Sequence, residues 1–165
     1  MIFPDFNNMN KINDIRLKYD PLERKVAPHI TIVFPFEGEI TDEDLISHFQ
    51  ETLKNVSSFE LSLKGIYKQV EEFAYYIFLN VSKGSKEIKN IHNLLYSNQL
   101  KSFDLGYEYT PHMTVGKFDS KEELDKAFNE LKLEDLEFST QVTTISIEVI
   151  GKNEESVIIF EHVLK

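Results

Sequence analysis

Two short segments each combine a histidine and a threonine in a pattern that suits acid–base chemistry. The first contains His29 and Thr31, and the second, 83 residues later, contains His112 and Thr114. With an unperturbed pKa of about 6.5, one imidazole can remove a proton near neutral pH while another donates one. Reaction at a phosphodiester needs both transfers, and threonine hydroxyls can hold the phosphate oxygens in line between them. The four side chains are therefore predicted to be catalytic residues acting on a phosphodiester.

Each motif is expected to lie in a β-strand with one polar and one apolar face. Side chains alternate along a strand, so each histidine shares a face with its threonine, while Ile30 and Met113 point the other way. Pro28 and Pro111 precede the histidines and donate no ladder hydrogen bond, which favours a strand start or a sheet edge. If a pseudo-two-fold axis relates the motifs, their polar faces meet around one phosphate-sized volume.

The same order of elements follows each motif. Amphipathic helices are predicted over 41–56 and 119–131, each behind a capping box. Further helices are predicted over 10–19, before the first motif, and over 85–99, between the copies. The strand patterns that come after the two motif helices cover 59–64, 73–81, 137–150 and 157–164.

The duplicated order predicts an α+β fold. A chain of 165 residues has the size of one domain, and neither half alone has enough apolar surface to fold stably. We therefore expect a single domain over 1–165, built from two pseudo-symmetric lobes centred on 27–82 and 108–165. Two antiparallel sheets are expected to form a central cleft, with the helices on the outside.

The composition excludes several kinds of site and partner. The chain has no Cys, which removes disulfides, thiolate zinc sites and a cysteine nucleophile, and the histidines outside the motifs are dispersed, so no metal or cofactor is expected. A net charge of −10 argues against strong binding of polyanions and favours a small nucleotide or an RNA terminus. No apolar run has transmembrane length, and a cytoplasmic monomer without membrane contact is expected.

Three residues near the motifs are predicted to bind substrate. Lys117 follows His112 by five positions, and its ammonium is expected to reach the phosphate from the edge of the site. Phe36 and Tyr109 are candidates for stacking a nucleobase, because an aromatic platform contributes about 1–3 kcal/mol per base. The alternative for both aromatic rings is that they fill the core.

These motifs resemble those of the two-histidine phosphoesterases, which include 2′-5′ RNA ligase-like and cyclic phosphodiesterase proteins. In that family, two His-x-Thr/Ser motifs, each followed by a hydrophobic residue, lie in the lobes of a bilobal α+β fold, and here those hydrophobic residues are Ile32 and Val115. Several members have a basic residue five positions after the histidine; this chain has Lys117 in the second copy and Phe34 in the first. The resemblance, which covers nearly the whole chain, implies opening of 2′,3′-cyclic phosphates, hydrolysis of cyclic ADP-ribose phosphates or reversible 2′-5′ joining of RNA.

Three functional hypotheses are open at this point. The first is a metal-independent phosphoesterase, hydrolase or phosphoryl transferase, that acts on a cyclic or 2′-5′ nucleotide or RNA phosphodiester, as RNA processing requires. The second is a non-catalytic nucleotide- or RNA-binding protein with the same cleft. The third is a structural protein whose histidines only satisfy the core. The duplication of the motif in matching contexts favours the first.

Overall fold

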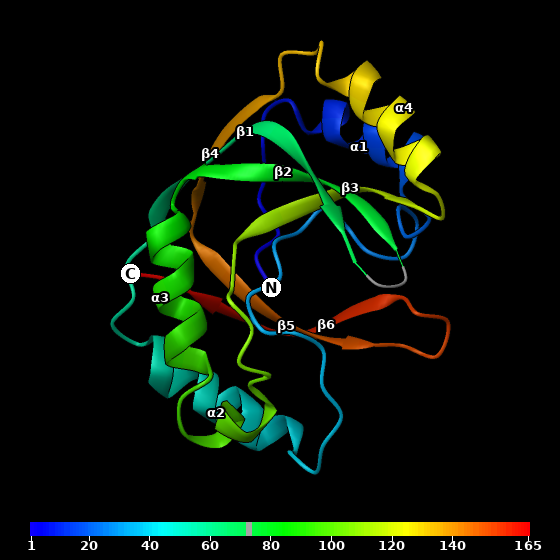
Figure 1. Ribbon diagram of the computed structural model, residues 1–165. Helices are drawn as coiled ribbons and strands as arrows, with labels where there is room; N and C mark the ends of the chain where they lie inside the picture. Colours follow the sequence, from blue (N-terminus) through cyan, green and yellow to red (C-terminus); the bar gives the residue numbers. More distant parts are fainter. Residues whose placement is uncertain (72–73) are drawn as a thin grey trace.

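Two antiparallel sheets form the β part of the computed structural model, which describes residues 1–71 and 74–165 (Figure 1). The predicted α+β class with two antiparallel sheets is confirmed. The larger sheet has the strand order β3-β2-β1-β4, and the smaller one pairs β5 with β6. Their bounds are β1 Phe59–Val70, β2 Tyr75–Lys83, β3 His112–Phe118, β4 Glu137–Val142, β5 Thr144–Ile150 and β6 Ser156–Val163.

The helices begin close to where the sequence predicts them. Thr41 accepts a hydrogen bond from the Asp44 backbone N–H at 3.1 Å, and Ser120 caps the later helix in the same way through Glu123, at 3.3 Å. Each cap satisfies one of the free N–H groups of a first helical turn. The bounds are α1 Met9–Tyr19, α2 Asp42–Leu53, α3 Ser85–Leu95 and α4 Lys121–Leu131, with a 3-10 helix over Asn98–Phe103.

One face of the large sheet is covered by helices and the other is not. In Figure 1, α1 and α4 lie side by side against this sheet, while α2 and α3 pack together at the lower left, near β6. The helix-facing side chains of the sheet include Leu61, Ile77, Leu79 and Met113, each 0% exposed. Burial of such a side chain contributes about 1.5–3 kcal/mol, so this face anchors the sheet and leaves the opposite face available for chemistry.

The strands are distributed between the sheets differently from the expected lobes. The segment 59–83, assigned by sequence to the lobe of the first motif, forms β1 and β2, and β2 pairs with β3 of the second motif. The predicted run 137–150 divides at Thr143 into β4, in the large sheet, and β5, in the small one. Alternating hydrophobicity identifies strands but does not specify their partners, which explains both differences.

The structure bears on the predicted start of one strand and on membrane-spanning helices. Phe73, the expected first residue of the second strand run, lies outside the described residues. Among the helices of the described chain, none combines the length and apolar character that a membrane-spanning segment requires.

Candidate active site

Ile30 joins the two sheets through backbone pairing. It exchanges two hydrogen bonds with Ile2, both 2.9 Å long, and on its other side it forms an antiparallel bridge with Met113 of β3. The backbone N–H of Ser146 in β5 donates in turn to the Met1 carbonyl at 2.9 Å. The first motif is therefore held by single bridges rather than in a full strand, whereas the second motif opens the edge strand β3.

This bridge determines which motif side chains lie together. Residues directly opposite in an antiparallel pair share a face, and residues one step along point to the other side. With Ile30 opposite Met113, His29 comes opposite Thr114 and Thr31 opposite His112. Ile30 and Met113 are fully buried and the four polar residues are half-buried. In this pairing the two histidines are diagonal neighbours, and diagonal neighbours in a regular ladder are about 7–8 Å apart.

Both imidazoles make the same local hydrogen bond. Nδ1 of His29 lies 2.8 Å from the Ala27 carbonyl oxygen, and Nδ1 of His112 lies 2.8 Å from that of Thr110. Because a carbonyl oxygen only accepts, each neutral ring carries its proton on Nδ1 and donates it there. Nε2 is thereby left as the basic nitrogen in both rings, and the two motifs present equivalent proton-transfer groups.

Burial lowers the pKa of both motif histidines below their usual value. For His29, the nearby carboxylate of Glu148 partly opposes this effect, and Glu71 does the same for His112. Two neutral imidazoles can both accept a proton, but neither can act as the general acid. A bound phosphate anion would restore the proton to one of them, since an adjacent negative charge raises the pKa of an imidazole.

The surroundings of His112 include side chains that the sequence pattern did not single out. Its ring stacks on Phe78 of β2, with centroids 3.8 Å apart and planes at 19°. Asn80 lies directly opposite His112 in the ladder and is exposed on the same face. His29 has a looser aromatic neighbour, Phe3, at 5.9 Å. The two histidines are thus alike in hydrogen bonding but differ in how tightly their rings are packed.

A β-bulge decides where Lys117 points. Strict alternation would place Lys117 on the apolar face, with Val115 and away from His112. In the ladder, however, Phe78 pairs with Thr114 and Ile77 with Gly116, so Val115 is an extra residue and the alternation shifts. Lys117 therefore lies opposite Tyr76, with its Nζ 6.0 Å from the ring centroid, on the face of the motif histidine.

Three side chains hold the backbone that follows His29. The Tyr109 hydroxyl donates to the Thr31 carbonyl at 2.6 Å, and His92 Nδ1 lies 2.6 Å from the Ile32 carbonyl. The Tyr96 hydroxyl accepts from the backbone N–H of Phe34 at 3.0 Å. The rings of His92 and Tyr109 stack with centroids 3.9 Å apart and planes at 2°. We call His92, Tyr96 and Tyr109 the motif bracket.

The contacts of the motif bracket favour the core alternative for Tyr109. Tyr109 is only 9% exposed and its ring packs against His92, so it is not free to stack a nucleobase. His92 is buried, and so is His48, whose Nε2 lies 2.9 Å from the Leu95 carbonyl. Amphipathic spacing could not reveal these roles, because both histidines bond to backbone carbonyls that are distant in sequence.

Phe36 follows Thr31 by five positions and borders a cavity whose lining includes neither motif histidine. This cavity has a volume of about 610 Å³ and lies between the 33–40 segment, α2 and β5. The Phe36 ring stacks on Phe103, with centroids 4.3 Å apart. Glu148, which affects the pKa of His29, also borders the cavity. The cavity lining includes the Phe36 ring and the Glu148 carboxylate, and base stacking on Phe36 stays a prediction.

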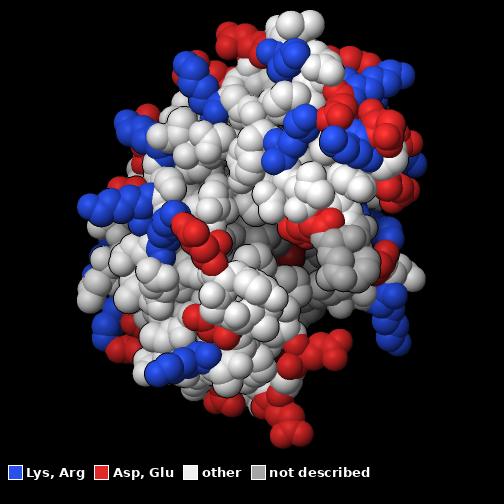
Figure 2. Space-filling model, viewed as in Figure 1, with Lys and Arg blue, Asp and Glu red and all other residues white. Residues whose placement is uncertain are grey.

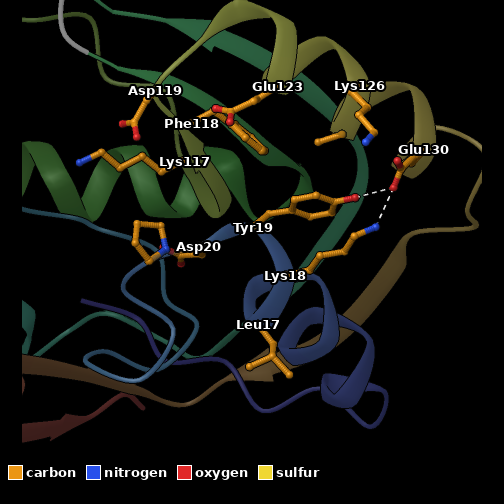
Figure 3. A pocket seen from close by; sticks show the side chains of 12 residues that line it. Leu17, Lys18, Tyr19, Asp20, Lys117, Phe118, Asp119, Glu123, Lys126 and Glu130 are labelled. Carbon is orange, nitrogen blue, oxygen red and sulfur yellow. Dashed lines mark hydrogen bonds and ion pairs between the residues drawn. The ribbon is translucent and has the colours of Figure 1, made fainter.

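A second cavity, of about 740 Å³, lies between the end of α1, the end of β3 and α4 (Figure 3). Lys18 and Tyr19 both donate to one carboxylate oxygen of Glu130, at 2.7 and 2.6 Å. Lys117 extends away from that contact, on the side of Asp119. The lining of this cavity includes Lys117 but neither motif histidine, so its floor is not the site of proton transfer.

The surface charge is mixed on the face shown in Figure 2. Lysine and arginine side chains alternate with acidic ones, and the surface is hollowed near its centre, between the upper and lower halves. Over residues 1–71 and 74–165, no three His, Cys, Asp or Glu side chains are grouped to hold a metal ion. The groups near the motif histidines that can bind an anion are the threonine hydroxyls, the imidazoles and the Lys117 ammonium.

The sequence matches a known family over most of its length. The sequence model of the 2′-5′ RNA ligase superfamily matches residues 4–154. The chain belongs to the 2′-5′ RNA ligase superfamily. A provisionally named phosphoesterase of Bacillus licheniformis is 27% identical over 140 residues, covering 82% of this chain and 79% of the relative. One from Bacillus mycoides is 28% identical over 155 residues, covering 86% and 81%.

Solved structures of proteins with this fold extend the comparison. Escherichia coli LigT in complex with 3′-AMP is similar with a TM-score of 0.66 and 18% identity, covering 98% of this chain and 94% of that chain. A protein of Thermus thermophilus gives a TM-score of 0.65 at 12% identity, covering 99% and 94%. At these identities the comparison shows the fold. Membership in the 2′-5′ RNA ligase superfamily and the fold together support phosphoesterase activity in general terms.

Proposed function

We propose that this protein is a metal-independent phosphoesterase that acts on a cyclic or 2′-5′ phosphodiester of a nucleotide or an RNA terminus. The observation that supports it best is the Ile30–Met113 bridge, because antiparallel pairing at this point favours a common face for both His-x-Thr pairs. The two equivalent Nδ1 hydrogen bonds add support, since they leave Nε2 of both rings for proton transfer. LigT has been crystallised with 3′-AMP and with ATP, and we extend nucleotide binding to this chain by analogy.

In the proposed reaction, the phosphate lies between His29 and His112. The neutral imidazole takes a proton from water, or from a ribose hydroxyl in the transfer reaction, as that oxygen forms its bond to phosphorus. The bond from phosphorus to the ester oxygen breaks, and the protonated imidazole gives its proton to the leaving oxygen. Thr31 and Thr114 donate to the non-bridging oxygens, and Lys117 adds positive charge at the edge. After the reaction the ring that acted as base is protonated and the ring that acted as acid is neutral. Proton exchange with water after product release restores the starting state.

The binding groups in this proposal are unequal. Lys117 approaches from the side of His112, and Phe36 borders the cavity between the 33–40 segment, α2 and β5. With a net charge of −10, long polyanions gain little from the surface as a whole. We therefore propose a small nucleotide or the end of an RNA as the substrate and a monomeric cytoplasmic enzyme as the working form.

The test is hydrolysis of nucleoside 2′,3′-cyclic phosphates in the presence of EDTA. Wild-type protein should turn over, and His29→Ala or His112→Ala should lower kcat by about 10²–10⁴-fold, the usual contribution of a positioned acid or base. His162→Ala, in β6, is the matched control and should retain activity. Full activity of both motif variants would refute the proposal. Activity that EDTA removes and metal restores would instead indicate metal catalysis, and saturable binding without turnover would indicate a binding protein.

A further inference from the structure

An aromatic surface continues from His112 across the uncovered face of the large sheet. Phe78 lies under the imidazole, with centroids 3.8 Å apart, and Tyr76 lies next to Phe78, with centroids 5.5 Å apart and planes at 26°. Tyr67 of β1 meets the Phe78 ring edge-on at 5.5 Å. We call Phe78, Tyr76 and Tyr67 the aromatic ledge. It begins at one motif histidine and extends away from the other.

The ladder registers show that this row belongs to the reactive face. Phe78 pairs with Thr114, Tyr67 with Phe78, and Gln69 with Tyr76, and directly opposite residues share a face. Phe78 is 6% exposed, whereas Tyr76 and Tyr67 are half-buried. The ring that supports His112 is therefore covered, and the two tyrosines present the accessible part of the ledge.

Polar groups border the aromatic ledge. The Lys117 ammonium lies 6.0 Å from the Tyr76 ring centroid, and Gln69 is exposed directly opposite Tyr76. Burial raises the pKa of Tyr67 and of Tyr76, so both hydroxyls stay protonated near neutral pH and can donate hydrogen bonds. An aromatic surface with amide, hydroxyl and ammonium groups at its edge matches a nucleobase attached to a phosphate.

We propose that the aromatic ledge binds the nucleobase of the substrate by stacking on Tyr76, with Tyr67 as a neighbouring aromatic contact, on the His112 side of the phosphate. This inference rests on the proposed function for the position of the phosphate. It commits the substrate class to phosphodiesters with at least one nucleoside. Stacking is tolerant of base identity because every base has a π-face, so the ledge selects for a base more than for one particular base. Gln69, with both a donor and an acceptor, is the group that can discriminate among bases.

Two neighbouring tyrosines provide a matched pair of variants. Tyr76 points to the ledge, while Tyr75, opposite Phe118, packs against the core on the other face. Tyr76→Leu and Tyr75→Leu make the same chemical change on successive residues of β2. Tyr76→Phe keeps the aromatic plane. Each variant is assayed on adenosine 2′,3′-cyclic phosphate and on glycerol 1,2-cyclic phosphate, which has the same five-membered phosphate ring but no base.

With Tyr76→Leu, KM for the adenosine substrate should rise about 5- to 150-fold, the loss that corresponds to one stacked base. The kcat/KM for the glycerol substrate should not change, and Tyr76→Phe should behave like wild type. An equal loss on both substrates would overturn the proposal, because Tyr76 would then act by supporting His112 through Phe78. Equal losses for Tyr75→Leu and Tyr76→Leu on the adenosine substrate would also overturn it, since they would reflect a disturbed sheet.

Calorimetric binding of adenosine 3′-monophosphate separates this proposal from the proposed function. Tyr76→Leu should weaken this binding by the same 5- to 150-fold range, whether or not the protein turns over. Tyr76-dependent binding without turnover of either cyclic phosphate would refute the proposed enzyme and leave the ledge as a base site. Turnover and binding that are both indifferent to Tyr76→Leu would refute the ledge and leave the enzyme.

Discussion

The motif bracket makes a sharp prediction for Tyr109→Phe. The change removes one hydroxyl, which donates to the Thr31 carbonyl at 2.6 Å from a side chain only 9% exposed. The ring and its stacking on His92 remain. Leaving this part-buried carbonyl without its partner costs about 1–3 kcal/mol, so the free energy of unfolding should fall by that amount. For a protein of this size, about 2–4 °C of Tm is lost per kcal/mol.

The effect on activity should exceed the effect on substrate binding. Thr31 shares its peptide unit with the lost hydrogen bond, and a small displacement of a positioning group can cost up to about 10²-fold in rate. We expect kcat on a nucleoside cyclic phosphate to fall about 10- to 100-fold with little change in KM. Tyr107→Phe, at a tyrosine 71% exposed, is the matched control and should change neither Tm nor kcat. A stable Tyr109→Phe protein with wild-type kcat would refute the bracket as a positioning device.

Three further predictions concern other parts of the structure. Arg16→Met should lower the free energy of unfolding by about 3–5 kcal/mol in denaturant titrations. The change leaves the Asp20 carboxylate buried without the Arg16 Nε that lies 2.7 Å from its Oδ2. Lys18→Met is the control and should have little effect. Burial lowers the pKa of both motif histidines, so the pair with one neutral and one protonated ring is most populated below pH 6.5. We expect kcat/KM to peak there and to fall as the pH rises. A maximum of kcat/KM above neutral pH would contradict this. Lys117→Gln should raise KM about 2- to 5-fold at low salt and less at high salt, as expected for an exposed charge; a salt-independent change would exclude the phosphate contact.

The sequence was informative where chemistry and local pattern coincide. Two His-x-Thr segments in matching contexts predicted a shared polar face, and the Ile30–Met113 bridge brings these segments together. The capping boxes at Thr41 and Ser120 predicted two helix starts, because a cap is a contact over only three residues. These features depend on neighbours in sequence, and a single sequence contains that information.

Features that depend on distant partners were out of reach. The bulge at Val115, which turns Lys117 to the reactive face, follows from how β3 fits β2 and leaves no composition signal. Tyr109 is a sequence candidate for base stacking because it lies close to a motif, yet its partner is the carbonyl of Thr31, 78 residues away. The same limit applies to Phe78, whose contact with His112 needs the strand pairing to be known.

The ledge and the motif pair together distinguish the roles of the two histidines. If the nucleoside lies on the ledge, the ribose oxygen that leaves when a 2′,3′-cyclic phosphate opens faces His112, whose ring contacts Phe78 at 3.8 Å. His112 is then the acid and His29 the base that activates water. A substrate whose leaving oxygen is replaced by sulfur needs no acid, since a thiolate leaves unprotonated. That substrate should restore activity to His112→Ala much more than to His29→Ala, and the reverse ranking would place the nucleoside on the other side of the phosphate.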